Sequence, residues 1–275
     1  MSVFWAPLDV ETAEEEGFLD AFRAAPPALA RQHGIACTRI GGAVCGRIAD
    51  LPRSRIFNHV RGLGRSSPAT DEQFEEIAGF YGEETYFVAV AQDTRPSDLA
   101  VLLERRGFEP DYPWTKFRRG VDPPAQVETD LRVEPIGPQH ASDFGRIVAA
   151  GFELPAFTGR WLAAIFGRPG WTCFVAFAGN EPAATGALFV SRRVGWLSFA
   201  ATLPEFRRRG AQTALLAARI GAAAELGCTM VVGETGALEE GRPSNSYRNI
   251  VRAGFEPVYD RPNYRSPQPI GPSGE

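Results

Sequence analysis

The stretch that decides the fold is TLPEFRRRGAQTALL, residues 202–216. Apolar residues precede it, three arginines and a glycine form its centre, and an alanine-rich segment typical of a helix follows. The first turn of a helix has unpaired backbone N–H groups and the positive end of the helix dipole, which both favour an anion. Glycine lets the backbone approach closely, and arginines add fork-shaped donors. The pattern indicates either a site for a polyanion such as a pyrophosphate or a solvated basic loop.

The overall composition separates these two interpretations from a nucleic-acid site. The chain has 275 residues, 44% of them hydrophobic and 23% charged, and a formal net charge of −4. A general nucleic-acid binder is strongly basic, and no aromatic residues alternate with the arginines, so a nucleic-acid partner is excluded. No apolar run is long enough to span a membrane, and the first residues lack the segments of a signal peptide. We therefore expect no membrane partner and a cytoplasmic location.

The cysteines and histidines give no sign of a metal site. Four cysteines and three histidines are present, without a CxxC motif or a spacing typical of zinc ligands. We expect buried, reduced thiols and no metal.

A repeated motif indicates that the chain is a duplication. RRGFEPDY at 105–112 recurs 147 residues later as RAGFEPVY, with six of eight positions identical. At the same offset, the arginine turn corresponds to HVRGLGRSS, another basic turn with glycines. We predict a tandem pair of α/β (α+β) units, each with a mixed, mainly antiparallel sheet flanked by helices. The predicted segments are a first domain at 1–120, a proline-rich linker at 121–130, a second domain at 131–265 and a disordered tail at 266–275.

The second half shows a clear order of elements. Helical spacing of apolar residues and runs of strand-forming residues alternate, and Gly227 provides a stop for the helix that begins after the arginine turn. The predicted order is a strand at 131–136, helices at 138–152 and 157–166, a three-stranded meander at 172–202, a helix at 211–226, a strand at 228–234, a helix at 245–253 and a closing strand from 254.

The arginine turn and its flanks resemble the signature of the GNAT acyltransferase superfamily. In that family Arg/Gln-x-x-Gly-x-Gly/Ala, between a strand and a helix, binds the pyrophosphate of acetyl-CoA. Arg207 and Gly210 match this signature, and Gln212 replaces its last small residue. FAATLPEF is similar to the family's splayed fourth strand, and NSYRNIVRAGFEPVY to its final helix and strand. The resemblance covers 131–265, and the first half resembles a degenerate copy, as in tandem members.

The resemblance implies acetyl-CoA as co-substrate. The residues expected to bind it are Ala200, Ala201, Thr202, Arg207, Arg208, Arg209, Gly210, Ala211, Gln212, Thr213, Ser246 and Asn249. The last two have an alternative role in capping or fixing the connection before their helix. In the first half, Pro68 and the capping signal at Asp71 move the helix start beyond the glycines, so we expect one cofactor per chain.

Acetyl transfer to an amine requires a neutral amine, a polarised carbonyl and a protonated leaving thiolate. Family members often place a tyrosine acid four residues before the Gly-Phe pair, where this chain has Ile250. Tyr247, one helical turn earlier, is the candidate substitute, and the alternative is that it packs its helix on the sheet. Glu234 ends an apolar strand beside the expected site. It is the candidate general base, or else a counter-ion for the amine or a polar residue at the strand's exit.

Aromatic residues on the two helices before the meander lie in the region that covers the acceptor in the superfamily. They either pack in the core or give the acceptor an apolar wall; they are Phe152, Phe157, Trp161 and Phe166. The leading prediction is an N-acetyltransferase that acts on a small amine or amino-acid-like acceptor by direct attack in a ternary complex, as a monomer or homodimer. The alternative is a non-catalytic CoA-binding or regulatory module.

Overall fold

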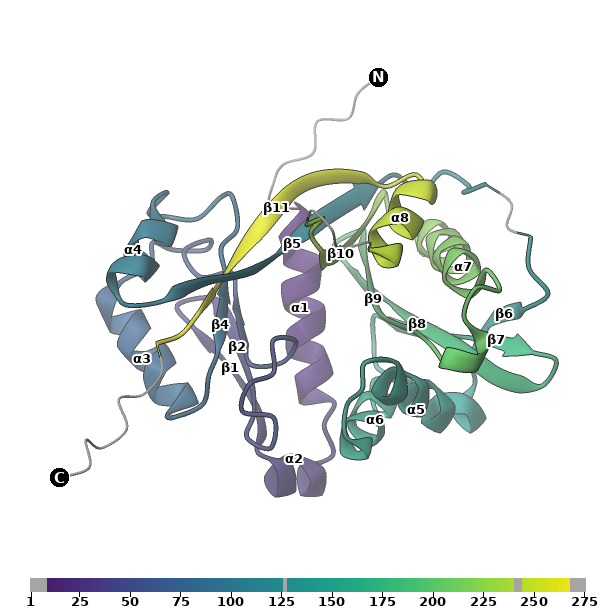
Figure 1. The fold of residues 1–275 in the computed structure, drawn as a ribbon, viewed down its shortest axis with the longest axis horizontal. Coiled ribbons are helices and arrows are strands. Elements are labelled where there is room, and N and C mark those ends of the chain that lie inside the picture. Colours follow the sequence, from purple (N-terminus) through teal and green to yellow (C-terminus); the bar gives the residue numbers. More distant parts are fainter. Residues whose placement is uncertain (1–8, 126–127, 240–243, 268–275) are drawn as a thin grey trace.

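The two halves of the chain build one continuous sheet (Figure 1). The computed structural model describes residues 9–125, 128–239 and 244–267. The strands are β1 (Ile35–Ile40), β2 (Ala43–Ile48), β3 (His59–Arg61), β4 (Phe87–Ala89), β5 (Glu109–Arg119), β6 (Arg132–Pro135), β7 (Trp171–Ala178), β8 (Glu181–Ser191), β9 (Val194–Thr202), β10 (Met230–Gly236) and β11 (Glu256–Arg265). The helices are α1 (Asp9–Arg23), α2 (Pro27–His33), α3 (Asp71–Tyr81), α4 (Leu99–Arg105), α5 (Ala141–Gly151), α6 (Ala156–Ala163), α7 (Ala211–Glu225) and α8 (Asn245–Arg252), with 3₁₀ turns η1 (Pro138–His140) and η2 (Pro204–Phe206).

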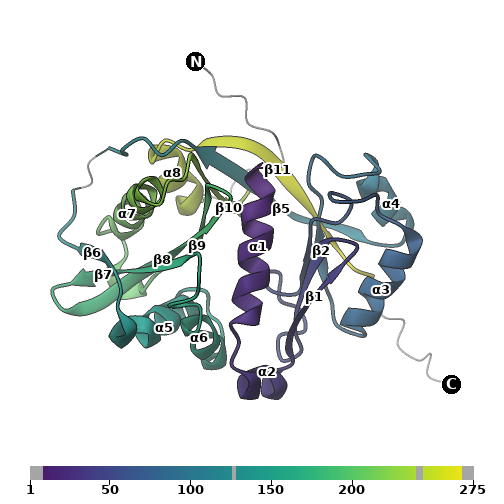
Figure 2. The ribbon, with the colours of Figure 1, turned by 180° about the vertical axis from the view of Figure 1, so that it is seen from behind.

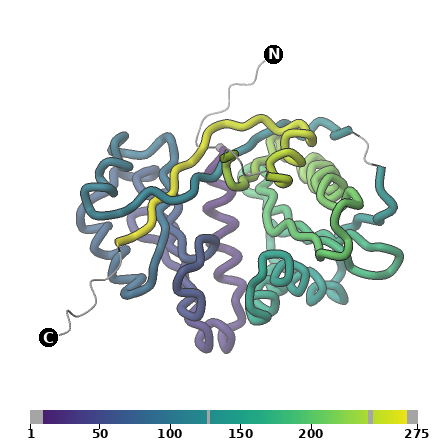
Figure 3. The backbone as a smooth tube through the Cα atoms, in the orientation of Figure 1, coloured from purple at the N-terminus to yellow at the C-terminus, as the bar shows by residue number. Residues whose placement is uncertain are grey.

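The halves exchange their last strands. The strand order is β1-β2-β3-β4-β11-β5-β10-β9-β8-β7-β6, so β5 lies between β10 and β11, and β11 lies between β5 and β4. Figure 3 shows this crossing, where the yellow end of the chain runs along the teal segment of the first half. Both strands follow the repeated GFEP motif, and they pair antiparallel with each other. The predicted mixed, mainly antiparallel α/β fold is confirmed, but the two sheets are joined into one.

The symmetry of the sheet agrees with a duplication. Parallel pairing in the described sheet occurs between β3 and β4 in one half and between β9 and β10 in the other, and the remaining pairs are antiparallel. Each parallel pair precedes a helix and an exchanged strand. The boundaries of the two domains stay a prediction, and residues 126–127 of the linker and 268–275 of the tail lie outside the described residues.

Helix α1 stands between the two halves, as the view from behind shows (Figure 2). It contacts β1 and β2 on one side and β8, β9 and β10 on the other. Its buried face combines apolar side chains, such as Phe18 and Phe22, with three glutamates that are also buried. Burial of charged groups requires partners. The first half supplies Arg61, Arg65 and Lys116, and the second half supplies Arg261.

The local signals of the sequence account for the helix boundaries near the site. Helix α7 begins at Ala211, directly after Gly210 with φ +80°, and is followed by Gly227 with φ +75°. Glycine adopts this left-handed conformation without strain. In the first half, α3 begins at Asp71, and Thr70 and Gln73 form a reciprocal capping box. The predicted starts of both helices are therefore confirmed.

Candidate active site

A cleft opens where two parallel strands separate. Strands β9 and β10 pair only from Val194 with Met230 to Trp196 with Val232. Beyond this point each strand continues without the other, and the space between them is a cleft of about 1230 Å³. The unpaired edges, the beginning of α7 and one face of α8 line it. The predicted splayed strand is thus present in the fold.

A bulge directs the edge of β9 into this cleft. The register with β8 shifts between Thr185, which pairs with Ala201, and Ala187, which pairs with Ser198, so β9 contains an extra residue. Phe199 lies in the bulge with φ +49° and lines the cleft. A left-handed backbone is uncommon for a bulky aromatic residue, and such strain is typical of functional sites. The sequence analysis did not identify Phe199, because a positive φ has no sequence signal in a non-glycine residue.

Arg219 supports the bulge from behind. Its side chain is buried, and it donates to the carbonyl oxygens of Leu215 at 3.0 Å, Ser198 at 3.3 Å and Ala187 at 3.4 Å. No carboxylate pairs with it in the described part of the chain, and burial lowers its pKa to about 10. Gly186 makes room for it, since a Cβ there would lie 2.8 Å from the guanidinium carbon. A buried, unpaired cation therefore sits against the bulge.

The charge of Arg219 acts on the peptide bond between Ser198 and Phe199. In a trans peptide the carbonyl and the next N–H point in opposite directions. The Ser198 carbonyl accepts from Arg219, and both residues line the cleft, so the guanidinium acts on the peptide whose N–H is that of Phe199. Hydrogen bonding of the carbonyl to a cation polarises the peptide and makes that N–H a better donor.

The arginine turn lies at the other end of the cleft and has the form expected of an anion site. Arg207 and Arg208 are exposed and line the cleft together with Gly210, and the first turn of α7 follows with its unpaired N–H groups. Gln212 donates to Thr202 Oγ1 at 2.8 Å, which ties the turn to the end of β9. Arg209 instead forms an ion pair with Asp130 and is not part of the lining.

The remaining predicted cofactor residues lie on the same cleft. The lining contains Ala200, Ala201, Thr202, Ala211, Gln212, Thr213, Ser246 and Asn249. The cap of α8 is Ser244, whose hydroxyl accepts from the N–H of Tyr247 at 3.1 Å. Ser246 is therefore not the cap of its helix, and both it and Asn249 face the cleft. Tyr247, on the same helix, does not line the cleft. Its ring packs edge-on against Phe117, with the ring centroids 4.9 Å apart.

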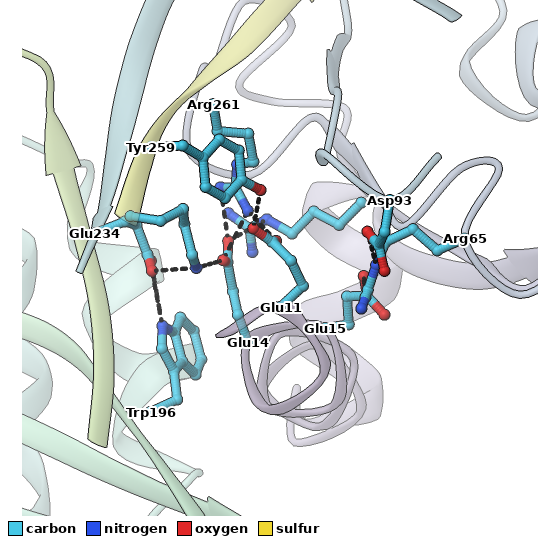
Figure 4. A network of polar contacts seen from close by, with 11 residues as sticks. Glu11, Glu14, Glu15, Arg65, Asp93, Trp196, Glu234, Tyr259 and Arg261 are labelled. Atoms are coloured by element: carbon cyan, nitrogen blue, oxygen red, sulfur yellow. Dashed lines mark hydrogen bonds and ion pairs between the residues drawn. The ribbon is translucent and has the colours of Figure 1, made fainter. Parts of the chain in front are cut away.

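Glu234 projects from β10 into the inner end of the cleft. Lys116 Nζ donates to its Oε2 at 3.2 Å, and Trp196 Nε1 contacts both carboxylate oxygens at 3.1 and 3.2 Å (Figure 4). Its side chain is 12% exposed. Burial, and then the neighbouring charge of Glu14, raises the pKa of Glu234, and Lys116 opposes this shift. The carboxylate is a stronger base than an ordinary glutamate.

A buried ion-pair network connects Glu234 with α1. Lys116 bonds both Glu234 and Glu14, and Arg261 bonds Glu14 at 2.8 and 3.0 Å and Glu11 at 2.6 Å. Figure 4 shows the network between α1 and the strands of the sheet. The cations hold the pKa of Glu14 well below its usual value, although burial alone would raise it. Residues from both halves therefore fix the position of Glu234.

The aromatic residues predicted for the acceptor divide into two groups. Phe152 is 40% exposed and lines the cleft. Phe157 stacks on His33 with centroids 3.9 Å apart, and Trp161 is buried and donates to the carbonyl of Ala21 at 2.8 Å. Phe166 also packs against this core. Phe157 and Trp161 thus face the first half, because α2 and α1 cover them.

The first half supplies the other wall of the cleft, which the sequence analysis did not anticipate. Its residues there come from α1, the loop after β2, β3 and β5, and are Phe18, Ile56, Phe57, Arg61, Tyr112 and Trp114. These residues are scattered over almost one hundred positions of the sequence, so only the folded structure shows that they lie together. Only the exchange of β5 brings the last two beside Glu234.

The corresponding turn of the first half is occupied by protein side chains. Arg65 bonds Asp93 at 2.9 Å and also pairs with Glu15. The Glu15 carboxylate lies where a Cβ on Gly62 would be, within 2.7 Å. Carboxylates in this position repel a phosphate, and α3 starts well beyond the glycines.

Three further observations concern membrane spans, metal ligands and cysteines in the described residues. None of their helices is both long and apolar enough to cross a bilayer. They contain no group of three or more histidine, cysteine or acidic side chains arranged to hold a metal. All four cysteines are free thiols, three of them buried.

Comparison with known proteins agrees with this geometry. Residues 145–240 match the Acetyltransferase (GNAT) family, while no curated protein matches the chain. Similar solved structures include GCN5-related N-acetyltransferases from Kribbella flavida (14% identity, 94% of this chain and 96% of that chain, TM-score 0.62) and Sphaerobacter thermophilus (18%, 95% and 93%, 0.59). A tandem GNAT protein from the clavulanic acid biosynthesis pathway is similar too, with 17% identity, coverage of 97% of this chain and 98% of that chain, and a TM-score of 0.57. Residues 145–240 thus match the GNAT acetyltransferase family, and the whole chain has a fold similar to that of these solved structures, a tandem GNAT protein among them.

Proposed function

We propose that the chain is an acetyl-CoA-dependent N-acetyltransferase that acts on a small amine or amino-acid-like acceptor by direct attack in a ternary complex. One observation supports the proposal: a single cleft joins the start of α7 with its two arginines, the bulge of β9 that Arg219 holds, and the carboxylate of Glu234. Each matches one requirement of the reaction, namely a bound pyrophosphate, a stabilised carbonyl oxygen and a base.

The second half alone would bind the cofactor. Its pyrophosphate would lie against the N–H groups of Gly210 to Thr213, with Arg207 and Arg208 as additional donors. The pantetheine arm would run along the unpaired edge of β9 at Ala200 to Thr202. Asn249 and Ser246 face this path from α8. The carboxylates in the equivalent turn of the first half support a single site per chain.

The Phe199 N–H would hold the thioester carbonyl oxygen. As the amine attacks, negative charge develops on this oxygen, and a fixed donor stabilises it. The new C–N bond replaces the C–S bond. Arg219 contributes from behind the peptide, at no cost of reorganisation because it is already in place.

Glu234 would take the proton that the amine loses, directly or through water. The departing thiolate needs no strong acid, because a thiolate is a good leaving group. Tyr247 remains the candidate acid, but it does not line the cleft, whereas Ile250 does. Solvent in the cleft is the alternative donor.

Replacement of Arg219 tests the role of the bulge. We expect Arg219→Met to lower kcat on the order of 10-fold to 100-fold, because a polarised donor is lost, and to leave the affinity for CoA, which has no acetyl carbonyl, unchanged. Arg219→Lys, which keeps the charge, should recover part of kcat. Equal losses in CoA affinity and in kcat would mean that Arg219 only supports the fold.

The alternative, a non-catalytic CoA-binding module, is motivated by Ile250 at the position of the usual acid. Release of free thiol from acetyl-CoA distinguishes the two functions. Acetylation of any member of a broad amine panel, with product identified by mass, supports the transferase. Tight binding of acetyl-CoA with no release above the rate in buffer across the whole panel supports the binding module.

A further inference from the structure

The cluster around Glu14 contains one cation that lacks a second counter-ion. Arg61, Lys116 and Arg261 all contact the Glu14 carboxylate. Lys116 and Arg261 each reach another carboxylate as well, as described above. For Arg61, Glu14 is the sole carboxylate partner among the described residues, at 3.0 Å from Nε to Oε1.

Arg61 also differs from the other two cations in its position. It lines the cleft, whereas neither Lys116 nor Arg261 does. Its side chain is 4% exposed. Its Nε is ion-paired with Glu14 but lacks hydrogen-bond geometry to that carboxylate, and its Nη1 has no hydrogen-bond partner among the described residues. The ring of Phe18 covers one face of the guanidinium at 3.7 Å. A buried arginine with unused donors at the edge of a cleft is suited to a planar, bidentate anion such as a carboxylate.

The charge balance of the network favours an anionic ligand. Arg61 is among the cations whose charge acts on Glu234. When Glu234 accepts a proton from the amine, the network loses one negative charge while its three cations remain. An additional carboxylate at Arg61 compensates for that loss and avoids an unpaired buried cation.

We infer that the acceptor carries a carboxylate close to its amine, with Arg61 of the first half as the carboxylate's partner and Glu234 of the second half as the amine's partner. This inference rests on the proposed function. Phe57, Trp114 and Phe152 line the same cleft, so the acceptor has an apolar or aromatic portion. The first half then selects the acceptor, while the second half binds the cofactor.

The test compares three probes that share one side chain: L-phenylalanine, L-phenylalaninamide and 2-phenylethylamine. We expect the kcat/KM of phenylalanine to exceed that of the other two by at least roughly 100-fold, because a site with buried donors rejects analogues that lack the acceptor group. The amide has the less basic amine, so intrinsic reactivity alone favours the amide. A preference for the acid therefore reports recognition of the carboxylate.

Variants assign the preference to Arg61. Arg61→Met should reduce the ratio of acid to amide to within about 5-fold, since the partner of the charge is gone, and Arg61→Lys should retain an intermediate ratio. Arg31→Met, which removes an exposed arginine remote from the cleft, is the matched control and should keep the wild-type ratio. Acetyl-CoA affinity, measured by calorimetry, should be the same in all four proteins and reports folding.

The outcomes separate this inference from the proposed function. If the wild type acetylates all three probes with similar kcat/KM, or if Arg61→Met keeps the wild-type ratio, the inference is wrong and the transferase stands. If no probe in this set or in the broad amine panel is acetylated, the proposed function fails, and this inference fails with it. If Arg61→Met does not fold, the wild-type ratio and Arg61→Lys still decide.

Discussion

Replacement of Gly210 by aspartate should abolish acetyl-CoA binding. The residue has φ +80°, and a Cβ would meet the Glu128 carbonyl oxygen and the Thr129 side chain at 3.3 Å. The new carboxylate would also lie at the start of α7, where the proposed pyrophosphate binds. Like charges in contact cost several kcal/mol, so we expect the dissociation constant to rise at least ~100-fold. Isothermal titration calorimetry measures it.

The same helix provides a matched control. Gly227 follows the other end of α7 with φ +75°, and nothing lies within 4 Å of a Cβ placed there. Gly227→Asp therefore imposes similar backbone strain and the same charge far from the cleft, and its affinity for acetyl-CoA should equal that of the wild type. Gly210→Asn separates the contribution of charge from that of bulk. Wild-type affinity in Gly210→Asp would show that the phosphates bind elsewhere.

Replacement of Glu234 by glutamine should lower kcat by roughly 10²-fold to 10⁴-fold, the usual contribution of a general base. The affinity for acetyl-CoA should stay the same, because Glu234 lies at the inner end of the cleft. Glu225→Gln, on an exposed part of α7, is the control. A kcat within about 3-fold of the wild type would exclude Glu234 as the base.

The pH dependence of kcat gives an independent test of the same residue. Glu234 acts as a base only when ionised, so activity falls as the pH drops through its pKa. An ordinary glutamate has a pKa of about 4.3. Because burial raises the pKa of Glu234, the acidic limb of the pH profile should lie above that value. This limb should keep its position when the acceptor amine is changed, and Glu234→Gln should lack it. A limb that moves with the basicity of each amine belongs to the acceptor instead.

The sequence predicts the start and end of α7 and the glycine turn before it, because the signals for them are local. Gly210, Gly227 and the arginines lie within one strand–turn–helix segment, and the conformations they favour do not depend on distant partners. The same is true of the capping box at Thr70, which places the start of α3. The strand exchange was not predicted, since strand order depends on pairing between residues far apart in the chain.

The acceptor end of the site depends on long-range contacts, and the sequence gives little sign of it. The glutamates of α1 form a charged run of the kind that is usually solvated. They are buried because four distant cations neutralise them, namely Arg61, Arg65, Lys116 and Arg261. Arg219 interrupts an alanine-rich helix, where an arginine is typically exposed. Trp161 has apolar helical spacing, which predicts burial but does not specify which surface covers it.

The measurement that tests the central claim most directly is a calorimetric titration of the wild-type protein with acetyl-CoA. The predicted result is one site per chain with micromolar affinity, and its loss in Gly210→Asp. Two sites per chain would contradict the division of roles between the halves. Absence of binding would mean that the turn at 207–213 is only a basic loop, and the acetyltransferase proposal would fall with it.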